Sequence, residues 1–222
     1  MNGRLANGTF RPVLNPYASS HRSDDFCEGT AWQWTFFVPH DIDGLVELFG
    51  SKEEFAKKLD SLFTVSSNIQ GQSVSGDISG MIGQYAHGNE PSHHIAYIYN
   101  KIGQPWKAQK YVNHILTKLY SNTPDGLCGQ DDTGQMSAWY IFSAMGFYPL
   151  DPVAQIYEIG SPLFPEVSMK IGNGKIFKVI ALNHSSENIY VQSAKLNGNF
   201  LNRSFITFDD IRDGGVLEFR MG

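Results

Sequence analysis

Three stretches of this sequence place carboxylates beside glycine and directly before apolar, aromatic-rich segments. They are FCEGTAWQW with Glu28, AHGNEPSHH with Glu90, and CGQDDTGQMSAW with Asp131 and Asp132. A carboxylate at a helix start is stabilised by the helix dipole and by unpaired backbone N–H groups, so helix capping accounts for any one of them. Capping does not account for the threefold recurrence of the pattern. The recurrence favours one shared site.

Carboxylates in such surroundings suit acid-catalysed cleavage of a glycosidic bond. One carboxyl group protonates the leaving oxygen, while a second activates water or attacks directly. Glycine lets a ligand approach the backbone, and aromatic faces stack on sugar rings. Glu28 is close in sequence to Phe26 and Trp32, which predicts a raised pKa and a bound proton. Asp131 and Asp132 lie among Gly, Gln and Thr, so we expect them to be hydrated and ionised.

The histidines around Glu90 raise the question of a metal. They are His87, His93 and His94, and their pattern is not HExxH. Adjacent helical residues point about 100° apart, which disfavours a zinc site at the His93–His94 pair. Glu90 with Asn89 and nearby backbone carbonyls gives an oxygen-rich set that suits calcium better. The alternative for the two adjacent histidines is structural, with rings bonded to backbone or carboxylate around a helix start.

The segments that must position these residues are predicted to be helices in the first part of the chain and strands after it. Asn89 is expected to cap a helix that contains Pro91 in its first turn and ends at Gly103. Helix pairs joined by loops rich in glycine and proline predict helical hairpins, as in a helical toroid whose mouth carries the HGNE and GQDD loops. The helical segments are 30–38, 41–50, 51–63, 89–103, 105–120 and 135–146.

From residue 156 onward the spacing at which apolar residues recur changes from about 3.6 towards 2, which predicts strands. Hairpin turns are expected at NG 173–174, NG 197–198 and DGG 213–215. The fold class is therefore mainly α, then β, with an antiparallel β-rich segment at the C-terminal end. The strand-like segments are QIYEIG, EVSMKIG, IFKVIAL, IYVQSAKL, SFITF and VLEFRM.

Composition narrows the classes of function. The chain has 222 residues, is 41% hydrophobic and 18% charged, and carries a net charge of −5, so no basic face indicates nucleic acid. No apolar run approaches the roughly 20 residues that span a bilayer, and the first residues lack the apolar core of a signal peptide. The sequence contains no GxSxG, P-loop or GxGxxG motif, so serine hydrolase and nucleotide-binding interpretations have no support.

Three long blocks of the sequence closely resemble the catalytic domain of glycoside hydrolase family 92. The blocks are EGTAWQWTFFVPHDIDGL, IGQYAHGNEPSHHIAYIYNKIGQPWKAQ and DGLCGQDDTGQMSAWYIFSAMGFYPLDP, and the similarity extends from residue 10 to at least residue 163. Members of that family are exo-acting α-mannosidases that need calcium and invert the anomeric centre. The resemblance implies hydrolysis of terminal α-linked mannose from mannosides or N-glycans.

The resemblance also implies roles for the carboxylates. Glu28, in EG-x-AWQ, matches the general acid, and Asp132, in GxxDxGQMSAW, matches the general base, with Asp131 beside it. Glu90, with Asn89, matches a calcium site at the floor of the mannose pocket. The acid and calcium roles could be exchanged between Glu28 and Glu90. The residues implied to line the pocket are Trp32, Gln33, His93 and His94.

The chain departs from the family pattern at two positions. Thr30 stands where the family often has Asn, and Gln130 stands where Asn or Asp is expected. The second departure removes a further carboxylate from the GQDD loop.

The family fold implies an N-terminal β-sandwich packed on an (α/α)6 toroid. We expect residues 1–155 to be the second part of the toroid, residues 156–222 to be the β-rich segment, and the sandwich to be absent. The missing domain is then a partner, and an incomplete toroid could also pair with another copy of the chain. The resemblance implies a secreted, periplasmic or cell-surface protein. The rival interpretation is a truncated, non-catalytic fragment that acts only as a carbohydrate-binding or structural module.

Overall fold

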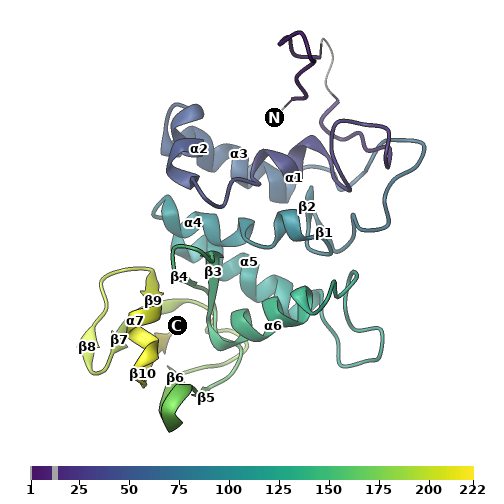
Figure 1. The fold of residues 1–222 in the computed structure, drawn as a ribbon. Coiled ribbons are helices and arrows are strands. Elements are labelled where there is room, and N and C mark those ends of the chain that lie inside the picture. The colour runs from purple at the N-terminus through teal and green to yellow at the C-terminus, as the bar shows by residue number, and fades with distance from the viewer. Residues whose placement is uncertain (1, 12–14) are drawn as a thin grey trace. The chain divides into compact units, whose positions relative to one another are not determined.

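The structure is a computed structural model that describes residues 2–11 and 15–222, leaving aside the side chain of Asn173. The chain divides into two compact units (Figure 1). The first unit comprises Met1–Ile95 and Ser121–Met136, and the second comprises Ala96–Tyr120 and Ser137–Gly222. Every residue that the sequence predicts for the site belongs to the first unit.

The first unit is built from short elements joined by long loops. Side-chain caps start its helices as the sequence predicts: the Ser51 hydroxyl accepts a hydrogen bond from the Glu54 backbone N–H at 3.2 Å, and the Asp41 carboxylate accepts one from the Gly44 backbone N–H at 2.9 Å. The elements are α1 (Ala31–Thr35), α2 (Ile42–Leu48), α3 (Lys52–Thr64), β1 (Met81–Ile82), β2 (Tyr85–Ala86) and the 3-10 turn η1 (Glu90–Ser92).

Aromatic side chains pack the helices of this unit together. Phe36, which follows α1, meets Phe55 of α3 edge to face with 5.8 Å between ring centroids. Phe63, near the end of α3, stacks on Tyr85 of β2 at 5.0 Å. All four rings are buried, and such pairs add to the stabilisation from apolar burial. The loops that carry the candidate site are therefore anchored on a packed base.

Two predicted helices are shorter than expected. The helix expected at 30–38 ends at Thr35, and the backbone N–H of Phe36 bonds to the carbonyl three residues earlier, at Gln33. Pro39 follows closely, and a residue before proline is disfavoured in helical conformation.

The continuous helix expected at 89–103 is wrong in the same way. The chain forms η1, then a second 3-10 turn, η2 (Ile95–Tyr97), and then the short helix α4 (Ile98–Lys101). Residues 91–100 are all buried, so side-chain contacts on every side override the helical pattern.

The second unit contains the longer helices. Helix α5 (Pro105–Lys118) begins with proline as predicted, and α6 (Gln135–Met145) matches the predicted segment and enters this unit at Ser137. The ring of Tyr97 stacks on Tyr148 at 5.3 Å, and its hydroxyl donates a hydrogen bond to the Ser143 hydroxyl of α6 at 2.8 Å.

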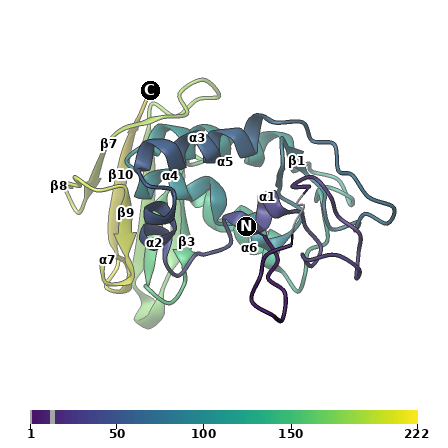
Figure 2. The same cartoon turned by 90° about the horizontal axis from the view of Figure 1, so that it is seen from above.

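Two sheets complete the second unit (Figure 2). One sheet has the order β5-β6-β10-β7-β8, and the other has the order β3-β4-β9. A short helix, α7 (Phe208–Arg212), precedes the last strand. The strands are β3 (Phe147–Asp151), β4 (Ile156–Ile159), β5 (Glu166–Lys170), β6 (Ile176–Leu182), β7 (Val191–Leu196), β8 (Asn199–Phe200), β9 (Phe205–Thr207) and β10 (Gly215–Met221), with the 3-10 turn η3 (Gly172–Gly174) between β5 and β6.

The sheets correct the prediction of a purely antiparallel segment. Strand β10 pairs in parallel with β6, whereas its other neighbour, β7, is antiparallel. The chain passes through β7, β8, β9 and α7 before it returns, so β10 inserts between two strands that are consecutive in sequence. The DGG segment accordingly leads from α7 into β10 and is not a hairpin turn, whereas NG 197–198 does join the antiparallel pair β7 and β8.

Strands also begin earlier than the sequence indicates. Strand β3 starts at Phe147, before the change of period at residue 156, and pairs antiparallel with β4. In the part of the chain that is described, no helix is both long and apolar enough to cross a bilayer.

Candidate functional site

The loop before α1 presents Glu28 in an unusual backbone conformation. Glu28 has a φ of 49°, in the left-handed region that costs energy for residues other than glycine. Its backbone carbonyl accepts a hydrogen bond from the Asn89 side chain at 2.8 Å. A Cβ on the next residue, Gly29, would lie 2.6 Å from the indole nitrogen of Trp34, so glycine is required there. The Glu28 loop is thus tied to the HGNE loop.

Glycine also lets the HGNE and GQDD loops touch. A Cβ at Gly129 would lie 2.6 Å from the Gly88 Cα, and one at Gly88 would lie 3.3 Å from the Cys128 carbonyl oxygen. The two loops therefore pack backbone against backbone, at a distance that no other residue type allows. The glycines that the sequence places beside the carboxylates bring two of the three segments together.

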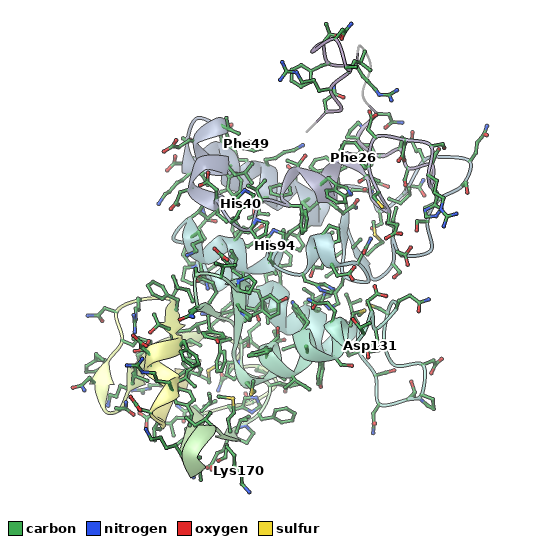
Figure 3. All side chains as sticks on the ribbon, in the orientation of Figure 1. Phe26, His40, Phe49, His94, Asp131 and Lys170 are labelled. Carbon is green, nitrogen blue, oxygen red and sulfur yellow. The ribbon has the colours of Figure 1, made fainter. Side chains whose placement is uncertain are left out.

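Asp131 and Asp132 lie on the loop that leads into α6, and Figure 3 labels Asp131 on this loop. Asp132 and Thr133 have φ values of 46° and 56°, and Gly134 continues this left-handed turn at 98°. Backbone N–H groups close the turn, because Gly134 donates to the Asp131 carbonyl at 3.1 Å and Gln135 donates to the Asp132 carbonyl at 3.2 Å. Asp132 is exposed and Asp131 is half-buried.

Electrostatics show that the three acidic segments meet. Burial raises the pKa of the Glu90 carboxyl, a backbone hydrogen bond opposes the rise, and the nearby carboxylates of Asp132 and Glu28 raise it further. Simple capping of three separate helices does not bring these groups within range of one another.

The adjacent histidines of HGNEPSHH are both buried. The Nε2–H of His94 donates to the Phe36 carbonyl at 2.7 Å, and the ring packs edge-on against Phe37. The Nε2–H of His93 donates to the His87 carbonyl at 2.9 Å. Burial lowers the pKa of each ring to about 4, although the backbone hydrogen bonds oppose the shift, so both rings are neutral at neutral pH.

Trp32 and Gln33 are buried on α1. The ammonium nitrogen of Lys58 lies 3.4 Å from the centre of the Trp32 ring, a cation–π contact. The Gln33 side-chain oxygen accepts from the Thr30 hydroxyl at 2.8 Å, and its nitrogen donates to the Gln84 carbonyl. The Gln33 side-chain oxygen also accepts from the Thr30 backbone N–H, which completes the capping box of α1. Whether these two side chains line a sugar pocket stays a prediction.

Two residues of this site, Gln135 and Gln84, were not predicted from the sequence. Gln135 donates from its side chain to the His93 Nδ1 at 3.2 Å, and Gln84 accepts from Gln33 through its carbonyl. The spacing of Gln135, three residues after Asp132, is the signal that could have drawn attention to it. Gln84 carries no such signal, because it meets α1 only in the folded unit.

Comparison with known proteins shows which family the chain belongs to. The sequence profile of the glycosyl hydrolase family 92 catalytic domain matches residues 1–222. The chain belongs to glycosyl hydrolase family 92. A secreted glycosidase of Arthroderma benhamiae is 34% identical over 203 residues, which cover 90% of this chain and 24% of that protein.

Solved structures of family 92 superpose on the whole chain. An α-mannosidase from Bacteroides thetaiotaomicron, in complex with mannoimidazole, has a TM-score of 0.93 and 43% identity, covering 100% of this chain and 30% of its own. An inverting mannosidase from the same organism has a TM-score of 0.84 and 38% identity, again over 100% of this chain and 30% of its own. The chain therefore spans about a third of the length of these family 92 structures or less.

The donor atoms near Glu90 fit a calcium ion. Calcium prefers oxygen ligands, and Glu90 supplies a carboxylate while Asn89 supplies an amide oxygen that already accepts from the Glu90 backbone N–H at 3.0 Å. Burial raises the pKa of Glu90, the nearby carboxylates of Asp132 and Glu28 raise it further, and a cation would relieve the repulsion between these charges. Within the described residues no three His, Cys, Asp or Glu side chains are grouped to hold a metal by themselves, so carbonyls, water and substrate would complete the shell.

Proposed function

We propose that this chain carries the catalytic carboxylates of an inverting, calcium-dependent exo-α-mannosidase. Its substrate would be a terminal α-linked mannose on an oligosaccharide such as an N-glycan. The observation that carries the proposal is the meeting of the three loops that hold Glu28, Glu90 and Asp132: the Asn89 side chain donates to the Glu28 carbonyl at 2.8 Å, and Gly88 packs against Gly129. Membership of family 92 and the mannoimidazole bound to a similar enzyme support the choice of mannose.

The match of Glu28 to the EG-x-AWQ segment of the family favours Glu28 as the general acid. An inverting glycosidase separates its acid and base carboxyls by about 6.5–9.5 Å, because the attacking water lies between them. Glu90 lies beside Asn89, whose side-chain oxygen accepts from the Glu90 backbone N–H at 3.0 Å, and the two together offer the oxygen ligands that calcium prefers. Of the two glutamates, Glu28 is therefore the better partner for Asp132, and Glu90 is the better calcium ligand.

The proposed reaction gives one step to each of two carboxyl groups. Glu28 protonates the departing glycosidic oxygen, and Asp132 removes a proton from the water that attacks the anomeric carbon from the opposite face. This single displacement inverts the anomeric centre. Asp131 lies beside the base, and its carbonyl accepts from the Gly134 and Met136 backbone N–H groups at 3.1 Å and 3.2 Å, which holds the loop in shape.

Glu90 and Asn89 would hold calcium at the floor of the pocket. When bound, the ion would polarise mannose hydroxyls and favour distortion of the ring towards the transition state. Asn89 also orients Glu28, because its side-chain N–H donates to the Glu28 carbonyl at 2.8 Å. One residue thus links the acid to the metal ligands. Trp32, Gln33 and His94 complete the proposed surroundings of the sugar.

The proposal extends to the protein of which this chain would be a part. The α-then-β order agrees with the family 92 structures over the region that they share. We propose that residues 1–155 supply the second part of an (α/α)6 toroid, that residues 156–222 form its β-rich extension, and that an N-terminal β-sandwich is the partner. The secreted relative supports action outside the cytoplasm.

The anomer of the released sugar tests this function. Proton NMR follows hydrolysis of an aryl α-mannoside in calcium-containing buffer from its first minutes. The proposal expects β-mannose to appear first and the α-anomer to grow in later by mutarotation. Release of α-mannose first would refute the inverting mechanism, and the absence of hydrolysis would favour a purely carbohydrate-binding or structural module.

A further inference from the structure

Both ring nitrogens of His93 are engaged by the protein. The ring is 3% exposed, its Nε2 lies 2.9 Å from the His87 carbonyl oxygen, and its Nδ1 lies 3.2 Å from the Gln135 side-chain nitrogen. A carbonyl oxygen can only accept, so Nε2 carries the proton. An amide nitrogen can only donate, so Nδ1 presents its lone pair. These contacts select one neutral tautomer of His93.

Gln135 connects this histidine to the Asp132 loop. It is the first residue of α6, and its backbone N–H donates to the Asp132 carbonyl at 3.2 Å. Asp132 and Thr133 both lie in the left-handed region, which the surrounding hydrogen bonds must stabilise. The side chain of Gln135 is held by His93 while its main chain closes the turn that sets Asp132.

The far end of the connection is fixed in a packed part of the first unit. The Tyr85 hydroxyl lies 2.8 Å from the His87 Nδ1, and the Tyr85 ring stacks on Phe63 at 5.0 Å. Tyr85 and His87 are both fully buried. A continuous set of contacts therefore runs from the base of the unit through His93 and Gln135 to the Asp132 loop.

We propose that His93 is a positioning residue that orients Asp132 through Gln135 and does not bind the sugar. A hydrogen bond to a mannose hydroxyl would need a ring nitrogen, and both nitrogens already have protein partners. The inference rests on the proposed function, because it takes Asp132 as the general base. It revises the role that the family resemblance implies for His93.

Two substitutions separate the two hydrogen bonds of the ring. His93→Asn places an amide near the position of Nδ1, so it keeps an acceptor for Gln135 and loses the donor to His87. His93→Gln places its amide near the position of Nε2, so it keeps the donor and loses the acceptor. We expect His93→Gln to lower kcat by about 10²-fold with KM unchanged, since small misplacements of a catalytic group cost that much. His93→Asn should retain most of the wild-type kcat.

A double-mutant cycle tests the connection through Gln135. Gln135→Met removes the donor at nearly constant volume. If His93 acts through Gln135, the double variant His93→Gln/Gln135→Met should lose no more kcat than Gln135→Met alone. Losses in kcat that simply add, or a rise in KM at constant kcat in His93→Gln, would overturn the proposal and indicate a direct sugar contact.

NMR of the chain supplies a readout that does not depend on activity. Long-range proton–nitrogen correlation identifies the protonated nitrogen of His93, and we expect Nε2. The side-chain NH₂ signals of Gln135 should shift in His93→Gln and stay near their wild-type positions in His93→Asn. Protonation at Nδ1, or Gln135 signals insensitive to both substitutions, would overturn the proposal. A wild-type protein without hydrolysis would instead refute the proposed function, and the NMR result would still decide the His93–Gln135 link.

Discussion

The two units of the chain differ in what fills their interiors. The interior of the second unit is dominated by a contiguous apolar cluster across its sheets, whose buried members include Phe177, Val179, Leu217 and Phe219. In the first unit many buried side chains are polar, and among those described are Thr30, Gln33, Gln84, His87, Asn89, Ser92, His93 and His94. A polar interior specifies one geometry only when its hydrogen bonds are satisfied. The comparison indicates that the first unit is organised to place carboxylates and the second to supply stability.

The backbone repeats this contrast. Glu28, Asp132 and Thr133 adopt left-handed conformations in the candidate site, whereas the corresponding non-glycine residues of the second unit, Gln155, Asn183 and Asn197, lie in connections between strands. Left-handed backbone conformations are common in the turns that connect strands. Strain at two carboxylates that meet in one site is typical of residues whose position matters for function.

The largest expected effect separates catalysis from stability in the first unit. Asp132→Asn should lower kcat by about 10²–10⁴-fold, the usual contribution of a general base. Because Asp132 is exposed, the free energy of unfolding should hardly change. Steady-state kinetics and urea unfolding measure the two quantities. Asp125→Asn, at an exposed aspartate of the preceding turn, is the matched control, and an equal loss of kcat there would break the comparison.

The converse substitution lies in the second unit. Phe219→Ala removes a fully buried ring from β10 and should cost about 3–5 kcal/mol in the free energy of unfolding. Phe200→Ala, whose ring is 72% exposed, should cost little. Thermal unfolding compares the two variants. If Phe219→Ala lowered kcat at temperatures where the protein stays folded, the second unit would contribute directly to catalysis and the contrast would fail.

The buried histidines make the first unit sensitive to acid. The pKa of His94 in the folded state is about 4, below its usual 6.5, so the unfolded state binds the proton first as pH falls. The contribution to stability is complete above pH 6.5 and is lost between pH 6.5 and 4, with a magnitude on the order of 3 kcal/mol. His94→Gln keeps a donor for the Phe36 carbonyl and should flatten the unfolding free energy across this range. An unchanged pH profile would contradict a neutral, buried His94.

Calcium should stabilise the first unit by a smaller amount. At a calcium concentration about 100 times the Kd, binding to the folded state adds about 2.7 kcal/mol, seen as a rise in Tm. Glu90→Gln should abolish this rise. The raised pKa of Glu90 also means that the calcium-free fold loses stability as pH rises through that pKa, and Glu90→Gln should remove this dependence. A calcium-dependent Tm that survives in Glu90→Gln would place the metal elsewhere.

The recurring acidic segments could be predicted from the sequence, because each one depends on local composition. Glycine beside Glu28, Glu90 and the two aspartates predicts close approach of backbones, and the contact of Gly88 with Gly129 is that approach. Local signals also predict α5 and α6, because the helical spacing of their apolar residues is not interrupted.

Features that depend on distant contacts are missed. The helix expected at 89–103 breaks into shorter turns because the segment is buried on all sides, and the parallel place of β10 depends on the return path of the chain. The pairing of Gln135 with His93 joins residues that are 42 apart in sequence, and no local sequence pattern predicts this contact. The division of roles between Glu28 and Glu90 likewise depends on where the folded chain places each carboxyl relative to Asp132.

The carboxyl separations in a crystal structure with calcium and a mannose-like inhibitor test the central claim most directly. We predict that the Glu28 and Asp132 carboxyls lie about 6.5–9.5 Å apart across an ordered water, while Glu90 coordinates calcium. Calcium on Glu28, with Glu90 and Asp132 facing each other across the water, would exchange the two glutamates. Three carboxyls far apart, each at the start of its own helix, would contradict the account of a shared catalytic site.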